Sequence, residues 1–131
     1  MKTYLGIDPG RSKTGLALVG EQGEILKLHI AQTAIISKEI MAFLQGEKPC
    51  CIVLGDGTSS KTMKKVLQEV LPELVICYVD EKHSTEEART LYWQVNPPKG
   101  LKKLLPLGLL VPEEPMDAYA AVVQVRRYLK L

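Results

Sequence analysis

Several acidic residues of this chain directly follow short apolar runs, which are the pattern of buried strands. These acids are Asp8, Asp56, Asp80 and Glu81. Ligands on an open α/β sheet gather at the carboxyl ends of its parallel strands, so we expect these carboxylates at one edge of a sheet. Carboxylates in one place repel each other unless a cation neutralises them, and an all-oxygen ligand set favours Mg²⁺ or Mn²⁺ over zinc. Two such ions about 4 Å apart can activate water and stabilise the leaving oxygen during phosphodiester cleavage.

The first of these acids stands at the tip of a predicted β-hairpin. The strand that ends at Asp8 is followed by Pro9-Gly10, which forces a turn because proline fixes φ and glycine accepts conformations closed to other residues. A second apolar run, 15–19, follows the loop. Gly6 and Gly15 flank the motif and, lacking side chains, allow a backbone or a ligand phosphate to approach closely. The loop carries two cations that are candidates for phosphate contacts, Arg11 and Lys13.

A fifth acid, Asp117, lies near the start of the last predicted helix, for which Pro115 suits the first position. By helical spacing it shares one face with two alanines, a glutamine and a tyrosine, namely Ala120, Ala121, Gln124 and Tyr128. Alanine side chains let a helix lie close against a sheet, and this would bring Asp117 inward, toward the other acids.

A helix predicted over residues 61–70 has lysines near its start. Lysines in a first turn oppose the helix dipole unless an anion lies nearby, and small hydroxyl residues just before a helix suit a phosphate. Lys61 and Lys64 are therefore candidates for nucleic-acid binding. The alternative is an ordinary helix capped by serine, with solvated lysines, and both interpretations are open at this point.

Composition limits the function classes. The chain has 131 residues, 46% of them hydrophobic, which predicts one globular domain over residues 1–131. The net charge of +2 is compatible with nucleic acid but requires local basic clusters, and aromatic residues at 5% do not indicate a stacking platform for single-stranded bases. Three cysteines in apolar runs predict neither a disulfide framework nor a zinc site. We see no secretory signal and no membrane-spanning run, and therefore expect a cytoplasmic protein.

The predicted order of elements is a three-stranded antiparallel meander followed by alternating helices and strands. The expected strands cover residues 4–8, 15–19, 25–31, 50–54 and 75–79. The expected helices begin at Ser37, Lys61, Ser84 and Pro115. Ser37 is the expected cap of its helix, Ser84 with Glu87 matches a capping box, and the continuous apolar runs 50–54 and 75–79 predict strands buried on both faces. The pattern indicates an α/β protein with a mixed five-stranded sheet flanked by helices.

Three motifs in this order resemble one nuclease family. They are residues 6–15 (Gly-Ile-Asp-Pro-Gly-Arg-Ser-Lys-Thr-Gly), residues 80–85 (Asp-Glu-Lys-His-Ser-Thr) with Ala88-Arg89, and residues 117–121 (Asp-Ala-Tyr-Ala-Ala). The set is similar to the RuvC/YqgF-type Holliday-junction-resolvase-like nucleases of the ribonuclease H-like superfamily. The resemblance implies a ribonuclease H-like fold and an endonuclease of the bacterial cytoplasm that depends on Mg²⁺ or Mn²⁺. Its substrate would be Holliday junction DNA or precursor 16S ribosomal RNA.

On this resemblance Asp8, Glu81 and Asp117 are the expected catalytic and metal-binding residues. Junction resolution by this chemistry would call for two active sites, which a homodimer would supply. The set expected to bind nucleic acid is Arg11, Lys13, Lys61, Lys64 and Lys82. The family usually has Arg where this chain has Lys82, so a bidentate phosphate contact would be absent there.

The second acid of the site is ambiguous. Side chains alternate between the faces of a strand, so Asp80 and Glu81 would not both point at the site if the pattern of 75–79 persisted. Glu81 has the longer reach, which favours it as ligand with Asp80 as a support. Asp56 is the weaker alternative, since RuvC-type enzymes carry an acid near that place, although Gly55 could occupy it instead.

Two other function classes remain open. An actin-like ATPase also begins with a hairpin of this kind, but such proteins close two domains around ATP. A ribonuclease H-like module that binds nucleic acid without cleaving it would share the fold and the basic residues.

Overall fold

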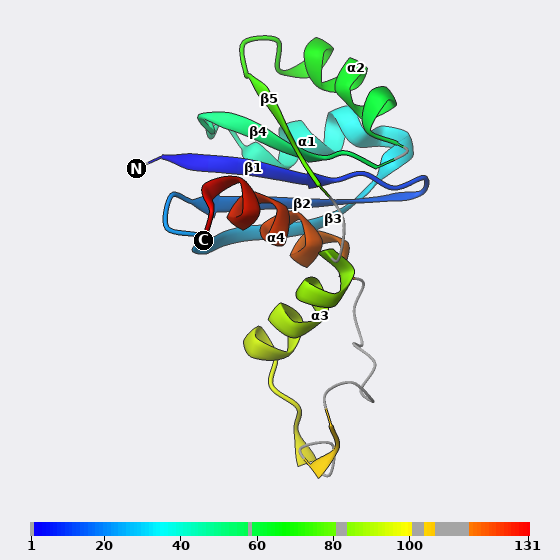
Figure 1. Cartoon of the computed structure of the whole chain (residues 1–131). Coiled ribbons are helices and arrows are strands. Elements are labelled where there is room, and N and C mark those ends of the chain that lie inside the picture. Colours follow the sequence, from blue (N-terminus) through cyan, green and yellow to red (C-terminus); the bar gives the residue numbers. More distant parts are fainter. Residues whose placement is uncertain (1, 58, 81–83, 101–103, 107–115) are drawn as a thin grey trace.

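The computed structural model describes residues 2–57, 59–80, 84–100, 104–106 and 116–131 (Figure 1). Its strands are β1 (Thr3–Asp8), β2 (Lys13–Gly20), β3 (Ile25–Gln32), β4 (Cys51–Gly55) and β5 (Ile76–Val79). Its α-helices are α1 (Ile36–Leu44), α2 (Ser60–Val70), α3 (Ser84–Val95) and α4 (Asp117–Leu129), and a 3₁₀ turn, η1 (Thr33–Ile35), precedes α1. The predicted α/β architecture is confirmed.

The strands form one mixed sheet in the order β3-β2-β1-β4-β5. β1, β2 and β3 are antiparallel neighbours, whereas β4 runs parallel to both β1 and β5. Leu54 of β4 pairs with Ile7 on one side and with Tyr78 on the other. The carboxyl ends of the three parallel strands therefore lie within about one residue of each other along one edge of the sheet, where the sequence predicted the acids.

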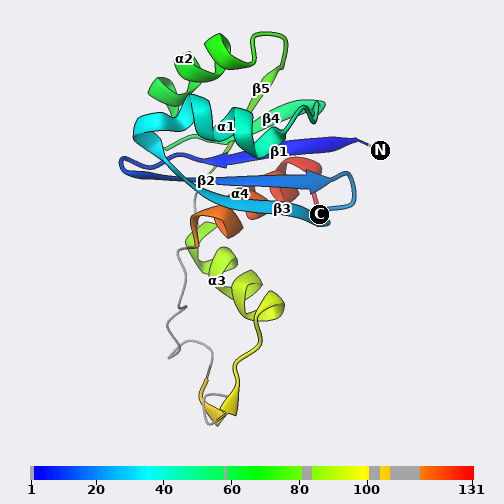
Figure 2. The ribbon, with the colours of Figure 1, turned by 180° about the vertical axis from the view of Figure 1, so that it is seen from behind.

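Helices cover both faces of the sheet (Figures 1 and 2). Under α1 and α2 lies one buried apolar cluster, which contains Leu5, Ile7, Leu54, Met63 and Leu67. Under α4 lies the other, which contains Ala17, Val19, Val53, Ala121 and Val125. α3 packs on α4 and extends away from the sheet. Within the described residues, no helix has the length and apolar character needed to cross a membrane.

Two glycines set the distance between α4 and the sheet. A Cβ atom built on Gly6 would lie 2.5 Å from the backbone oxygen of Ala121, and one built on Gly15 would lie 2.0 Å from the backbone oxygen of Asp117. Real Cβ atoms do not approach backbone atoms so closely. The helix backbone therefore rests on β1 and β2 at positions where only glycine leaves room.

Two element boundaries differ from the predictions. β2 begins at Lys13, so Lys13 and Thr14 belong to the strand and not to the hairpin loop. The strand starts early because it pairs with β3, where Lys13 faces Gln32. Ser37 is not the cap of α1: the helix begins at Ile36 directly after the 3₁₀ turn, and its N-cap position makes no side-chain hydrogen bond.

The prediction that 75–79 is buried on both faces is wrong. Within the described residues, β5 is the outermost strand of the sheet and has β4 as its one neighbour. The side chain of Val75 is 66% exposed and that of Tyr78 is 45% exposed. The prediction holds for residues 51–54, since every residue of β4 is buried, whereas Cys50 precedes the strand and is exposed.

We expect Gly15→Ala to lower the free energy of unfolding by about 1–3 kcal/mol, because its methyl group would push the start of α4 away from β2. Gly20→Ala is the matched control, since its methyl group would meet the end of the flexible Glu24 side chain, which can turn aside. Urea unfolding of both variants tests this. Equal stability of the two variants would show that α4 tolerates a wider spacing.

Candidate active site

Asp8 and Asp117 come from opposite ends of the chain and lie at the same end of the sheet. Asp8 is the last residue of β1, is half-buried, and pairs with Gly15 across β2. The backbone of Asp117, the first residue of α4, lies directly over Gly15. The close approach at Gly15 thus places Asp117 beside the end of β1 that carries Asp8.

Gln124 fixes the orientation of Asp8. Its Nε2 donates a hydrogen bond of 3.0 Å to Oδ1 of Asp8, and its side chain is fully buried. Gln124 Oε1 is also buried and has no hydrogen-bond partner in the part of the chain that the structure describes. The sequence placed Gln124 on the face of Asp117 but assigned it no role. A polar residue within the otherwise apolar run 118–125 is the signal that could have identified it.

The environment of Asp117 is partly desolvated. Burial raises the pKa of the Asp117 carboxyl group above its usual value, while the positive charge of Lys13 and a hydrogen bond from the backbone N–H of Asp117 oppose the rise. A carboxylate in this position is destabilised by loss of water, and a bound cation would offset that effect.

Asp56 and Asp80 also lie at this edge, but the strand pattern does not direct them to the α4 face. Val53 packs under α4 and Leu54 under α2, so continued alternation places Gly55 on the α4 side and Asp56 on the other. Both acids are exposed. The backbone N–H of Asp56 bonds to the oxygen of Val79, and the backbone oxygen of Asp80 accepts a 2.6 Å hydrogen bond from an arginine of α4.

The remaining predicted site residues, Glu81 and Lys82, lie outside the described residues. Across the described ranges, no three His, Cys, Asp or Glu side chains are grouped so that they could hold a metal ion. Asp8 and Asp117 nevertheless fit a hard cation, because both offer carboxylate oxygens and Asp117 is desolvated. The structure therefore brings Asp8 and Asp117 to the same end of the sheet, and the prediction that they bind a metal ion together with Glu81 stays a prediction.

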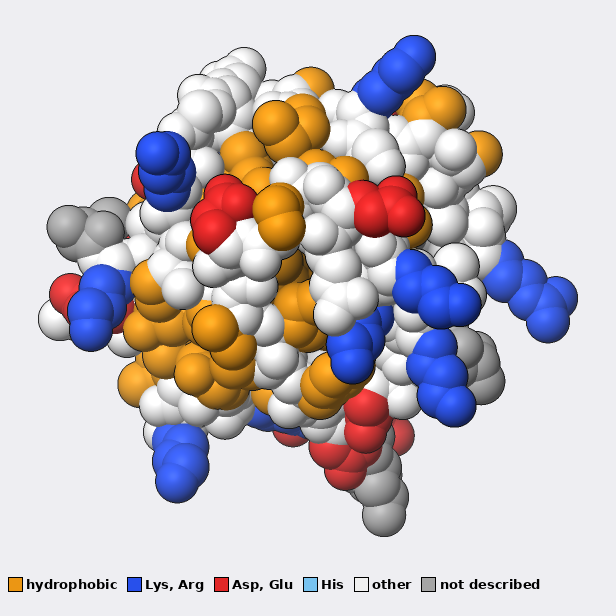
Figure 3. All heavy atoms as spheres, turned by 90° about the horizontal axis from the view of Figure 1, so that it is seen from above, with side chains coloured by type: hydrophobic (Ala, Val, Ile, Leu, Met, Phe, Trp, Pro, Cys, Tyr) orange, Lys and Arg blue, Asp and Glu red, His pale blue; other side chains and the backbone are white. Residues whose placement is uncertain are grey.

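The predicted phosphate-binding residues surround this edge. Arg11 is exposed and lines a cavity of about 180 Å³ between the first hairpin, η1 and α2. Lys13 is exposed at the start of β2 and acts electrostatically on Asp117. Lys61 and Lys64 are exposed on α2, whose N-cap residue, Ser59, makes no side-chain hydrogen bond. Viewed from above, Lys and Arg side chains gather along one side of the face that α2 covers (Figure 3).

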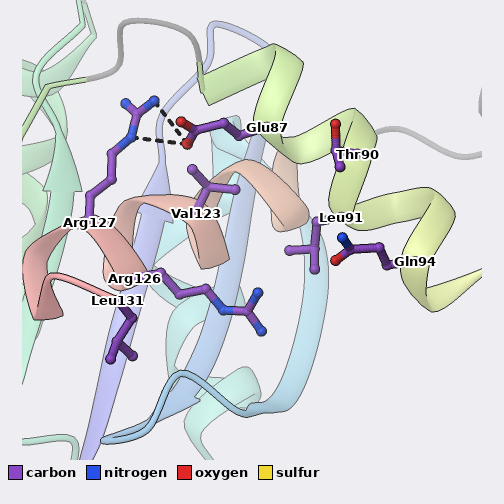
Figure 4. Close-up of a pocket in the computed structure, with 8 residues that line it drawn as sticks. All are labelled: Glu87, Thr90, Leu91, Gln94, Val123, Arg126, Arg127 and Leu131. Atoms are coloured by element: carbon purple, nitrogen blue, oxygen red, sulfur yellow. Dashed lines mark hydrogen bonds and ion pairs between the residues drawn. The ribbon is translucent and has the colours of Figure 1, made fainter. Parts of the chain in front are cut away.

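Arginines in the last turn of α4 hold the other end of the helix. Arg127 contacts Glu87 of α3 at 3.0 Å and donates to the backbone oxygen of Asp80, and Arg126 donates to the backbone oxygen of Gly23. A pocket of about 330 Å³ lies between α3, α4 and Leu131 (Figure 4). Glu87, which was predicted to form a capping box with Ser84, thus forms an ion pair with Arg127 of α4. The side chain of Ser84 lies outside the described residues.

The chain shares its fold with solved structures of other proteins. The structure matches Thermus thermophilus RuvC with a TM-score of 0.63 and 14% sequence identity, over 98% of this chain and 96% of RuvC. The chain has the RuvC-like, ribonuclease H-like fold. A structure of T. thermophilus RuvC in complex with a Holliday junction substrate matches with a TM-score of 0.60 and 16% identity, over 99% of this chain and 96% of that one. No family model and no curated protein matches the sequence.

Because burial raises the pKa of Asp117, its ionised form opposes folding, and the RuvC-like fold gains stability as the pH falls through the folded-state pKa. We expect Asp117→Asn to raise the melting temperature at pH 7, with a gain that shrinks toward the usual Asp pKa of about 3.9. Thermal melts from pH 7 to pH 4 in the presence of a chelator measure this.

The control for Asp117→Asn is Glu73→Gln, which neutralises an exposed acid in the turn before β5. A gain in melting temperature for Asp117→Asn that is independent of pH, or one that Glu73→Gln shares, would contradict the raised pKa of Asp117.

Proposed function

We propose that this chain is a metal-dependent endonuclease that cleaves phosphodiester bonds in structured nucleic acid. The observation that carries the proposal is the placement of Asp8 and Asp117 at the carboxyl edge of the sheet, brought about by the contact of α4 with Gly15. The RuvC-like fold supports it, and RuvC has been seen with a Holliday junction substrate. Four-way junction DNA is therefore the first substrate to test, and precursor 16S ribosomal RNA, which the motifs imply, is the second.

In the proposed mechanism Asp8 and Asp117 hold Mg²⁺ or Mn²⁺, with Glu81 as the third ligand. Such an ion, when bound, supplies Lewis-acid stabilisation of the phosphate and makes a bound water more acidic. Gln124 keeps one oxygen of Asp8 in a fixed position through the 3.0 Å hydrogen bond. Because its amide is fully buried, the orientation of Asp8 does not depend on solvent.

Cations around the edge would position the substrate. Arg11, Lys13 and Lys64 are exposed cationic side chains, which are suited to bind phosphates. Contacts with phosphate fix the register of a nucleic acid but do not read its sequence. We therefore expect recognition of shape, and symmetric cleavage of a junction would require a homodimer with two such sites.

We expect Asp8→Asn to lose Mn²⁺-dependent cleavage of four-way junction DNA while its unfolding curve stays close to that of the wild type. Gln124→Leu removes the hydrogen bond from Gln124 to Asp8 and should lower the cleavage rate roughly 10–100-fold, the effect typical of residues that orient a metal ligand. Single-turnover cleavage assays with and without Mn²⁺ give both rates, and Glu73→Gln serves as the control.

Equal cleavage by the wild type and Asp8→Asn would remove Asp8 from the mechanism. Tight binding without cleavage by any variant or the wild type would instead favour the non-catalytic module.

A second experiment identifies the remaining acid. Alternation along β4 directs Asp56 away from the α4 face, so we expect Asp56→Asn and Asp80→Asn to cleave at near wild-type rates. Glu81→Gln should lose cleavage and require more Mn²⁺ for what remains. The measurement is a Mn²⁺ titration of all three variants. Full cleavage activity of Glu81→Gln, together with loss of cleavage in Asp56→Asn, would identify Asp56, at the end of β4, as the remaining acid of the site.

A further inference from the structure

A basic groove runs between α2 and the free edge of the sheet. It has a volume of about 510 Å³, within the range of roughly 300–1,000 Å³ that is usual for ligand pockets. Its lining residues are Ser60, Lys61, Lys64, Lys65, Gln68 and Tyr78. None of these described lining residues is acidic, so the groove is complementary to a polyanion.

Helical spacing explains why three lysines line one groove. Lys61, Lys64, Lys65 and Gln68 stand at positions i, i+3, i+4 and i+7 and share one face of α2. The opposite face of α2 carries Met63 and Leu67, which are buried in the core. The lysine face is therefore held in place by packing and lies along the outer strand.

Tyr78 supplies the other wall. Ile76 packs against the cluster under α1 and α2, and alternation places Tyr78 on the same face of β5, beside the lysines. Its side chain is 45% exposed because β5 is an edge strand. Among the described residues, no aromatic ring stacks on Tyr78 and no lysine lies over its ring. An accessible aromatic face thus lies beside three ammonium groups.

We propose that this groove binds an unpaired stretch of nucleic acid, with one base stacked on Tyr78 and the adjoining phosphates on Lys61, Lys64 and Lys65. Bases in a duplex are stacked on each other and cannot offer a face to a side chain, whereas an unpaired base can. The groove opens at the carboxyl edge, because Tyr78 pairs with Leu54 one residue before the end of β4. It therefore lies at the same edge as Asp8 but on the opposite face of the sheet.

The inference rests on the proposed function for the kind of substrate, but its test does not depend on cleavage. Binding of fluorescein-labelled 15-nucleotide dT and U oligomers, and of a 15-base-pair duplex, is measured by anisotropy in the presence of a chelator and over a range of salt concentrations. Tyr78→Ala should weaken single-strand binding by about 5- to 150-fold and leave the salt dependence unchanged, because stacking releases no counterions. Its duplex binding should not change.

The lysines should show a different signature. Replacing Lys61, Lys64 and Lys65 together by Ala should reduce the slope of log K against log salt by about 2 for single strands. A matched triple variant at Lys38, Lys48 and Lys130, which are exposed elsewhere, should reduce it less. Equal reductions of this slope in the two triple variants would show that the groove lysines contribute only as general surface charge.

Two further variants separate stacking from folding. Tyr78→Phe keeps the ring and should bind like the wild type, whereas Tyr78→Thr keeps a residue suited to strands and should bind like Tyr78→Ala. Tyr128→Ala, which removes a 39% exposed ring at the end of α4, is the aromatic control. Wild-type single-strand affinity in both Tyr78→Ala and Tyr78→Thr would overturn the proposal.

Separate cleavage assays distinguish this inference from the proposed function. Single-strand binding that depends on Tyr78, without any Mn²⁺-dependent cleavage, would support binding in the groove and contradict the proposed nuclease function. Cleavage with binding independent of Tyr78 would do the reverse.

Discussion

The structure depends on the close contact between α4 and the first two strands. Gly6 and Gly15 have no side chains, so the backbone of the helix comes to rest on β1 and β2 themselves. Any larger residue at either position would lift the helix, and with it Asp117, away from Asp8. The two acids are 109 positions apart in the sequence (117 − 8), so this contact is what makes them neighbours.

Polar contacts in the middle and in the last turn of α4 keep the helix from turning or sliding on the glycines. In its middle, Gln124 bonds to Asp8 at the end of β1. In its last turn, Arg126 bonds to the turn between β2 and β3, and Arg127 bonds to the end of β5 and to α3. A helix fixed to four other elements can hold a desolvated Asp117 in one place, although the ionised carboxylate itself opposes folding.

Short sequence patterns predicted the elements that depend on interactions between residues close together in the chain. The strand that ends at Asp8, the turn at Pro9-Gly10 and a last helix that carries Asp117 follow from short-range patterns, and the structure contains all three. The expected first position of that helix, Pro115, lies outside the described residues. Exposure of Val75 and Tyr78 depends on β5 being the outermost strand, and the apolar run alone does not contain that information.

Contacts between residues far apart in the chain could not be predicted from the sequence either. The bond from Gln124 to Asp8 spans 116 positions, and no spacing rule connects them. Lys13 was expected in a loop because it is polar, yet pairing with β3 makes it the start of a strand and places its charge near Asp117. Scarce aromatic residues argued against base stacking across the whole chain, but a composition average does not show that Tyr78 stands exposed among lysines.

The alternation of side chains along the parallel strands gives the two faces of the sheet different chemistry. On β1 it directs Asp8 toward α4, where the partner acid lies, and on β5 it directs Tyr78 toward α2, where the lysines lie. The faces are separated by a packed sheet and meet at its carboxyl edge, so a single ligand can reach both by crossing that edge. A flexible, unpaired strand can bend around such an edge far more easily than a stiff duplex, whose persistence length is about 150 base pairs. The arrangement therefore suits a substrate that combines a cleavable backbone with unpaired nucleotides close to it, as branched and looped nucleic acids do.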